Sequence, residues 1–140
     1  MAVTANQLMQ AQNAGGLIGL PVLAARRLYQ ATICFVNRTS GAGEGYATDL
    51  DNAGANTFAG IVREEVNNSA GASGDFPDVE VYTEGDFVLQ GTGFLQGHVG
   101  DAAYASDNYT VTPTAAGSVL IGRFVEYISA TRMRVKIEVQ

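Results

Sequence analysis

Hydrophobic and polar residues alternate along much of the chain after residue 25, which is the pattern of strands that bury one face. The clearest case is the run 132–139, in which Met133 and every second residue after it are apolar while the residues between are charged. A register shift of one residue would bury four charges there. The orientation of this last strand is therefore strongly determined.

Further strands are expected where β-branched and aromatic residues cluster between turn signals. They cover residues 28–36, 46–48, 58–66, 79–84, 87–89, 109–112 and 119–128. By composition, residues 67–74 form a surface loop, and Gly85 marks a bulge or bend. About eight short strands without a long amphipathic helix predict an all-β fold, either a compact antiparallel β-sandwich or a small β-barrel.

Residues 1–25 contain no charged side chain and differ in this from residues 26–140. Isolated apolar residues in the first dozen positions offer no broad apolar stripe for a helix. We expect an extended N-terminal arm, residues 1–25, on a β domain formed by residues 26–140. In an extended conformation such an arm reaches on the order of 80 Å, which exceeds the radius of a small domain.

The apolar residues of this arm have two interpretations. They close over the chain's own core, which single positions favour slightly, or they are buried against another subunit, which the length and lack of charge favour. Arg26 and Arg27, at the junction, pair with carboxylates of a partner or form a solvated collar at the start of a strand. The candidate interface residues are Leu8, Met9, Leu17, Ile18, Leu20, Pro21, Val22, Leu23, Arg26 and Arg27.

Composition narrows the class of protein. The chain has 140 residues, of which 46% are hydrophobic and 16% charged, as expected for one ordered domain. Its net charge of −6 makes nucleic acid a poor partner. The apolar stretch 14–25 is too short and too interrupted by glycine and proline to span a bilayer, and no basic segment precedes it. We expect a soluble protein without membrane contact, made in a cytoplasm.

No pattern of residues indicates an enzyme. His98 is the single histidine and lies in a predicted turn, where an exposed or hydrogen-bonded loop histidine is favoured over a triad base. With Cys34 as the single cysteine, a zinc site of the usual nitrogen and sulfur ligands cannot form within one chain. Asp49 and Asp51 resemble the start of a calcium loop, but Gly60 stands where the bidentate glutamate is needed. Calcium shared between subunits remains an alternative to a polar turn. The glycine-rich segments lack the rest of a phosphate-binding motif, so we expect no catalytic residues, cofactor or metal, and Cys34 as a small buried hydrophobe.

The order of several short segments resembles the small capsid cement, or head decoration, proteins of tailed bacteriophages and prophages, of the β-domain type. The similarity covers residues 28 to 139, and its strength lies in the ordered series, since each segment alone is common. The segments are 28–29, 58–62, 67–74, 79–81, 85–87, 99–101, 107–111, 121–126 and 131–135. The arm departs from shorter members, which begin close to the first strand.

This resemblance implies a structural virion protein without catalytic residues. Such a protein is made in the bacterial host cytoplasm, binds the outer surface of the phage head as a homotrimer near three-fold positions, and stabilises contacts between major capsid proteins. Its partners are then the major capsid protein and itself. Removal of residues 1–25 is expected to leave the domain folded and to weaken capsid retention. The alternatives are a tail- or fibre-associated β module of the virion and a small carbohydrate-binding module, which the absence of tryptophan disfavours.

Overall fold

The computed structural model describes residues 16–75 and 77–139 of the chain. Within these residues, strands make up nearly all regular structure and one short 3-10 helix is the only helical element, so the all-β prediction is confirmed. The elements in chain order are β1 (Leu17–Leu20), β2 (Arg26–Leu28), β3 (Ile33–Val36), β4 (Ala47–Thr48), β5 (Thr57–Val62), β6 (Val66–Asn68), β7 (Val79–Tyr82), β8 (Glu84–Gln90), η1 (Gln96–His98), β9 (Ala102–Ala105), β10 (Val111–Thr112), β11 (Val119–Ser129) and β12 (Arg132–Glu138).

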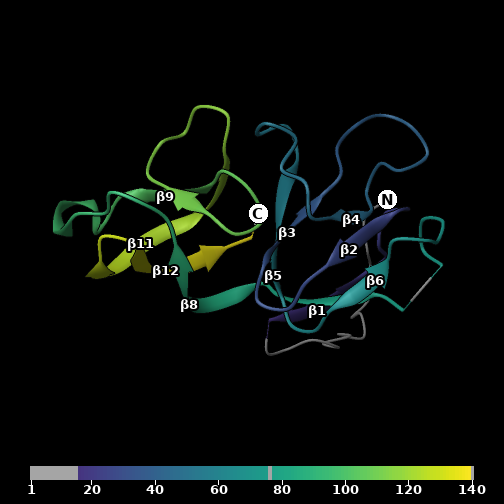
Figure 1. Cartoon of the computed structure of the whole chain (residues 1–140), viewed down its shortest axis with the longest axis horizontal. Helices are drawn as coiled ribbons and strands as arrows, with labels where there is room; N and C mark the ends of the chain where they lie inside the picture. The colour runs from purple at the N-terminus through teal and green to yellow at the C-terminus, as the bar shows by residue number, and fades with distance from the viewer. Residues whose placement is uncertain (1–15, 76, 140) are drawn as a thin grey trace, which may run out of the picture.

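The strands form two five-stranded sheets and one two-stranded ladder. The first sheet has the order β1-β7-β5-β3-β4, the second has the order β10-β9-β11-β12-β8, and β2 pairs with β6. All pairs within these sheets are antiparallel. Figure 1 shows the second sheet at one end of the long axis and the β2–β6 ladder at the other end.

The first sheet closes on itself through the segment that follows β1. Strand β1 pairs with β7 at one edge of the sheet. Two residues after β1 ends, Val22 forms a parallel bridge with Ala47 of β4, which is the opposite edge. The Leu23 N–H donates to the Ala47 carbonyl and the Ala47 N–H donates to the Pro21 carbonyl, both at 2.8 Å. Closure of this kind removes exposed strand edges, so the first sheet is a small barrel.

Residues 17–25 consequently belong to the domain, and the expected boundary between residues 25 and 26 is wrong for this segment. The physical reason is an alternation at Ile18, Leu20 and Val22, whose side chains share one face of an extended chain. That face covers the barrel interior, which we call the barrel core. Its buried members are Val22, Leu28, Cys34, Ala47, Ala59, Val62, Val79 and Val81.

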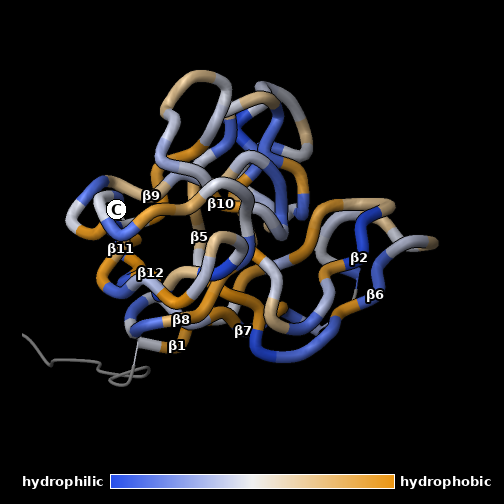
Figure 2. Tube along the Cα trace, turned by 60° about the vertical axis from the view of Figure 1, so that its left-hand side comes forward, coloured by the Kyte–Doolittle hydropathy of each residue, from blue (hydrophilic) through white to orange (hydrophobic). Residues whose placement is uncertain are grey.

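A second cluster, the sandwich core, lies between the outside of the barrel and the inner face of the second sheet. Strands β3 and β5 face both cores, because Ile33 and Phe35 contribute to the sandwich core while Cys34 contributes to the barrel core. Figure 2 shows the resulting interleaving of hydrophobic and hydrophilic stretches along the trace. The buried members of the sandwich core are Ile33, Phe35, Phe58, Ile61, Leu89, Phe94, Ala103, Ala105, Val111, Val119, Ile121, Phe124, Met133, Val135 and Ile137.

Two glycines shape the strands at close approaches. Gly60 has φ +146° at a register shift between β3 and β5, and a Cβ there would collide with the Tyr82 carbonyl oxygen of β7. Gly85 has φ +117° just after β7 ends and β8 begins. The chain passes from the first sheet to the second at this point, so the bend predicted at Gly85 is confirmed.

Several predicted strand boundaries are corrected by the structure. The predicted strand 28–36 is two strands, because a turn with Ala31 at φ +63° separates β2 from β3. The predicted strand 58–66 ends at Val62, and β6 begins a new ladder with β2. The predicted loop 67–74 begins inside β6, where Asn68 is fully buried. Strand β9 was not predicted, since its sequence, AAYA, offers little β propensity.

Candidate interaction surfaces

Three of the six predicted interface residues in the segment 17–23 turn toward the chain's own core. Val22 is 1% exposed and belongs to the barrel core, and Ile18 and Leu20 pack against it while partly buried. Leu17, Pro21 and Leu23 are also half-buried. For this segment, closure over the chain's own core is therefore what the structure shows. Leu8 and Met9 lie outside the described residues.

The turn after β6 holds the closing segment in place. The Asn68 side-chain amide donates to the carbonyls of Val22 at 3.3 Å, Leu23 at 3.0 Å and Ala72 at 2.9 Å. The Gly74 N–H donates to the Val22 carbonyl at 2.9 Å. The sequence analysis missed this role of Asn68, because asparagine in a polar stretch is the usual sign of an exposed turn. Its position two residues after Val66, on a β-alternating run, is the signal that was available.

Arg26 and Arg27 are both paired with carboxylates of the same chain. Arg26 makes a bidentate contact with Asp49, with Nε to Oδ1 at 2.6 Å and Nη2 to Oδ2 at 2.7 Å. These hydrogen bonds raise the pKa of the Arg26 guanidinium above its ordinary value. Arg27 donates to Glu65 at 2.9 Å and lies 4.8 Å from the centre of the Tyr29 ring. The pairs link β2 to its neighbours, and a contact of either arginine with a partner stays a prediction.

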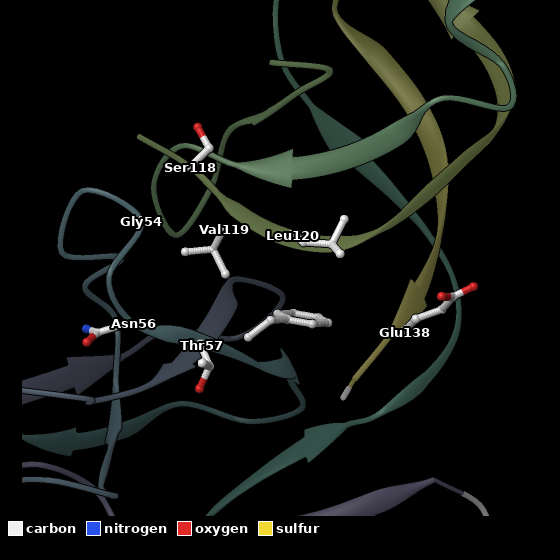
Figure 3. Close-up of a pocket in the computed structure, with 8 residues that line it drawn as sticks. Gly54, Asn56, Thr57, Ser118, Val119, Leu120 and Glu138 are labelled. Atoms are coloured by element: carbon white, nitrogen blue, oxygen red, sulfur yellow. The ribbon is translucent and has the colours of Figure 1, made fainter. Parts of the chain in front are cut away.

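An open hollow of about 290 Å³ lies where the two sheets meet. Figure 3 shows lining residues from β5 and the turn before it, from the start of β11 and the residue before it, and, at Glu138, from the end of β12. Phe58 and Val119 are nearly buried and make the floor, whereas Leu120 on the rim is 43% exposed. Glu138 is the single ionisable residue among those lining it. An apolar floor beside one carboxylate suits the stem and head of a long basic side chain.

Large apolar side chains are exposed at the far end of the second sheet. Leu95 is 64% exposed, Val99 37% and Ile128 43%. The backbone brings them to one end, because the Phe94 N–H donates to the Ala130 carbonyl at 3.0 Å and the Gly100 N–H donates to the Phe124 carbonyl at 2.8 Å. We call Leu95, Val99 and Ile128 the apolar tip. Contiguous exposed apolar surface marks contacts with other macromolecules, and these three side chains are the candidates for such a contact at this end of the sheet.

The residues considered for chemistry have structural surroundings. His98 ends η1, and its Nδ1 accepts a hydrogen bond from the Leu95 N–H at 3.1 Å. Cys34 is fully buried, as predicted, and burial raises the pKa of its thiol from 9.0 to about 12. Asp49 is engaged by Arg26. In the part of the chain that the structure describes, no three potential ligand side chains gather where they could hold a metal ion.

Comparison with family models, with curated proteins and with solved structures finds no match for this chain. Among residues 16–75 and 77–139, no helix has the length and apolar character needed to cross a membrane.

Proposed function

We propose that this chain is a structural protein of a tailed-phage virion that binds the outer surface of the head and stabilises contacts between major capsid proteins. The ordered series of segments between residues 28 and 139 supports this proposal, because it resembles the head decoration proteins. The all-β body agrees with the β-domain type of that family. The observation that supports the binding role is the apolar tip, whose three side chains are each more than a third exposed in the described structure.

The apolar tip is the proposed contact with the capsid. Burial of a large apolar side chain contributes about 1.5–3 kcal/mol when it is complete, and less for a side chain that is already partly covered. Three such residues per copy give a modest contact. A lattice of identical sites repeats this contact many times, so the whole coat resists disruption far better than one copy does.

Residues 1–15 are a second proposed contact, with Leu8 and Met9 as the apolar anchors among them. Val22 and its neighbours fill the chain's own core and do not serve this purpose. The capsid contact expected of the arm, residues 1–25, is therefore restricted to the residues before Gly16.

Co-sedimentation with purified heads of the encoding phage or prophage tests the proposal. Wild-type chain should pellet with expanded heads, and Leu95→Glu and Ile128→Glu should lose most of this binding while keeping their thermal midpoint. Ala70→Glu, which adds the same charge on an exposed turn after β6, is the matched control. Removal of residues 1–15 should weaken retention under heat or chelator. Equal pelleting of the Leu95 and Ala70 variants would contradict the proposed contact.

The location of the protein on the particle separates this function from the tail-associated alternative. Cryo-electron microscopy of the source virion should place it on the outside of the head. From the resemblance we also expect binding to expanded heads and not to unexpanded ones, because a surface present in one form alone stabilises that form by mass action. Density on tail or fibres alone would refute the cement role.

A further inference from the structure

The outer face of the second sheet has no covering layer among the described residues. Along β12, Met133, Val135 and Ile137 are buried in the sandwich core, so the residues between them point outward. On the neighbouring strands Val88 is 45% and Leu120 43% exposed on this side. A five-stranded face with exposed apolar residues is thus open to a partner.

Like charges lie directly opposite each other at two places on this face. Arg123 of β11 is the register partner of Lys136 of β12, and Glu138 of β12 is the register partner of Glu84 of β8. Cross-strand pairs of like charge are destabilising. None of these four residues has an ion-pair partner within 4.0 Å in the described chain. Arg123 donates to the Gly100 carbonyl at 3.0 Å and Lys136 is also the register partner of Asp86, so the chain compensates the basic pair in part. No ion pair within the described residues compensates the Glu84–Glu138 pair.

The basic pair and the acidic pair are neighbours on the same face. Lys136 and Glu138 are two residues apart on β12, so they point the same way about 7 Å from each other. Asp86 shares a row with Arg123 and Lys136 and leaves that row net positive. The face is consequently a positive patch beside a negative patch, with exposed apolar side chains around both.

Such an arrangement is complementary to itself. In a two-fold contact each residue of one copy meets a different residue of the other, and the second contact repeats the first. If the axis lies in the plane of the contact and crosses β12 obliquely near Ile137, the Arg123–Lys136 pair of each copy faces the Glu84–Glu138 pair of the other. Glu138 also borders the hollow of Figure 3, whose apolar floor accommodates the stem of the incoming basic side chain.

We propose that this outer face is a self-association surface, on which the Arg123–Lys136 pair of one copy contacts the Glu84–Glu138 pair of a second copy. The contact neutralises both like-charge pairs and covers Val88 and Leu120. Under the proposed cement function, this contact would link neighbouring copies on the head. It uses only residues within the described part of the chain. It therefore persists when residues 1–15 are removed.

Charge reversal and charge swap of the purified chain, without heads, test this contact. Sedimentation velocity at low salt should show a wild-type dimer that dissociates as salt rises. Lys136→Glu and Glu138→Lys each change both symmetric contacts and should raise the dissociation constant on the order of tenfold or more. The double variant Lys136→Glu/Glu138→Lys should restore the dimer, because it exchanges the two partners. Arg63→Glu, beside the first sheet where Arg63 pairs with Glu80, is the control and should leave association unchanged.

The single reversals also have a second readout, which separates association from folding. Lys136→Glu converts the like pair with Arg123 into an opposite pair and the opposite pair with Asp86 into a like pair. The two changes offset each other, so the thermal midpoint at low concentration should stay close to that of the wild type. A wild-type monomer at all concentrations, a trimer insensitive to the reversals, or a swap that fails to restore the dimer would overturn the proposal. Because heads are absent from this assay, a negative result speaks against self-association and does not bear on the cement function. Conversely, failure of the chain to bind heads speaks against the cement function and does not bear on self-association.

Discussion

Val22 tests the claim that the segment after β1 is part of the domain. Its side chain is 1% exposed, and its backbone bridges β4 at the edge opposite to β7. Val22→Ala removes two buried methyl groups, which costs about 1.6 kcal/mol at about 0.8 kcal/mol for each buried carbon. A cavity that relaxes incompletely adds up to about 1 kcal/mol. We therefore expect a loss of about 2 kcal/mol in the free energy of unfolding.

The matched control is Leu17→Ala on the same segment. Leu17 is half-buried and points away from the face that Ile18, Leu20 and Val22 share, so its truncation should cost less than about 1 kcal/mol. Urea denaturation followed by circular dichroism measures both, with an unchanged slope as the sign that only stability has changed. The expected loss for Val22→Ala corresponds to a thermal midpoint lower by roughly 6–8 °C in a chain of this size.

The measurement is made on dilute protein without heads, so that neither a second subunit nor the capsid contributes to the measured stability. If Val22 were buried only against another subunit, its truncation would leave the unfolding of isolated chains unchanged. Equal stability of Val22→Ala and wild type, within about 0.5 kcal/mol, would refute the closed barrel and return the segment to the arm first expected.

The other predictions concern the stability of the same β domain. Removal of residues 1–15 should preserve a cooperative unfolding transition, whereas removal of residues 1–25 deletes β1 and Val22 and should abolish it, as near-ultraviolet circular dichroism would show. Asn68→Asp places a carboxylate against three carbonyls and should cost at least about 2 kcal/mol in urea denaturation. Gly60→Ala forces a Cβ against the β7 backbone and should lower the thermal midpoint by more than 5 °C. Burial raises the folded-state pKa of Cys34 to about 12, so the contribution of the neutral thiol to the free energy of unfolding is complete below pH 9.0 and is lost as the pH rises from there through about 12. Cys34→Ala should therefore lose less stability over this pH range than the wild type. Identical pH profiles of stability for the two proteins would contradict the burial of the thiol.

The strands of the C-terminal half were predictable because each buries one face. The run 132–139 forms β12 with the predicted facing, since Met133, Val135 and Ile137 are all buried. The N-terminal half was harder, because β3 is buried on both faces and shows no alternation. The ends of such strands can be predicted only from the turns that flank them, and the turn at Ala31 contains neither glycine nor proline.

The sequence predicted that the segment 17–23 is buried, but not which surface buries it. Lack of charge marked residues 17–23 as a segment that must be buried, which is correct for Val22. Lack of charge does not say against what the segment is buried; the alternation at Ile18, Leu20 and Val22 carries that information. The outer face of β12 was visible in the sequence as alternating charges, but the opposition of Arg123 to Lys136 depends on strand pairing and bulges that no local pattern encodes.

Sharing of β3 and β5 between two cores joins the parts of the molecule mechanically. A side chain lost from the barrel core loosens the strand that also supports the sandwich core, because Cys34 faces one core and its neighbours Ile33 and Phe35 face the other. The two sheets should therefore unfold as one cooperative unit. Under the proposed function this coupling is useful, since force applied at the apolar tip is carried through β11 and the sandwich core into the barrel.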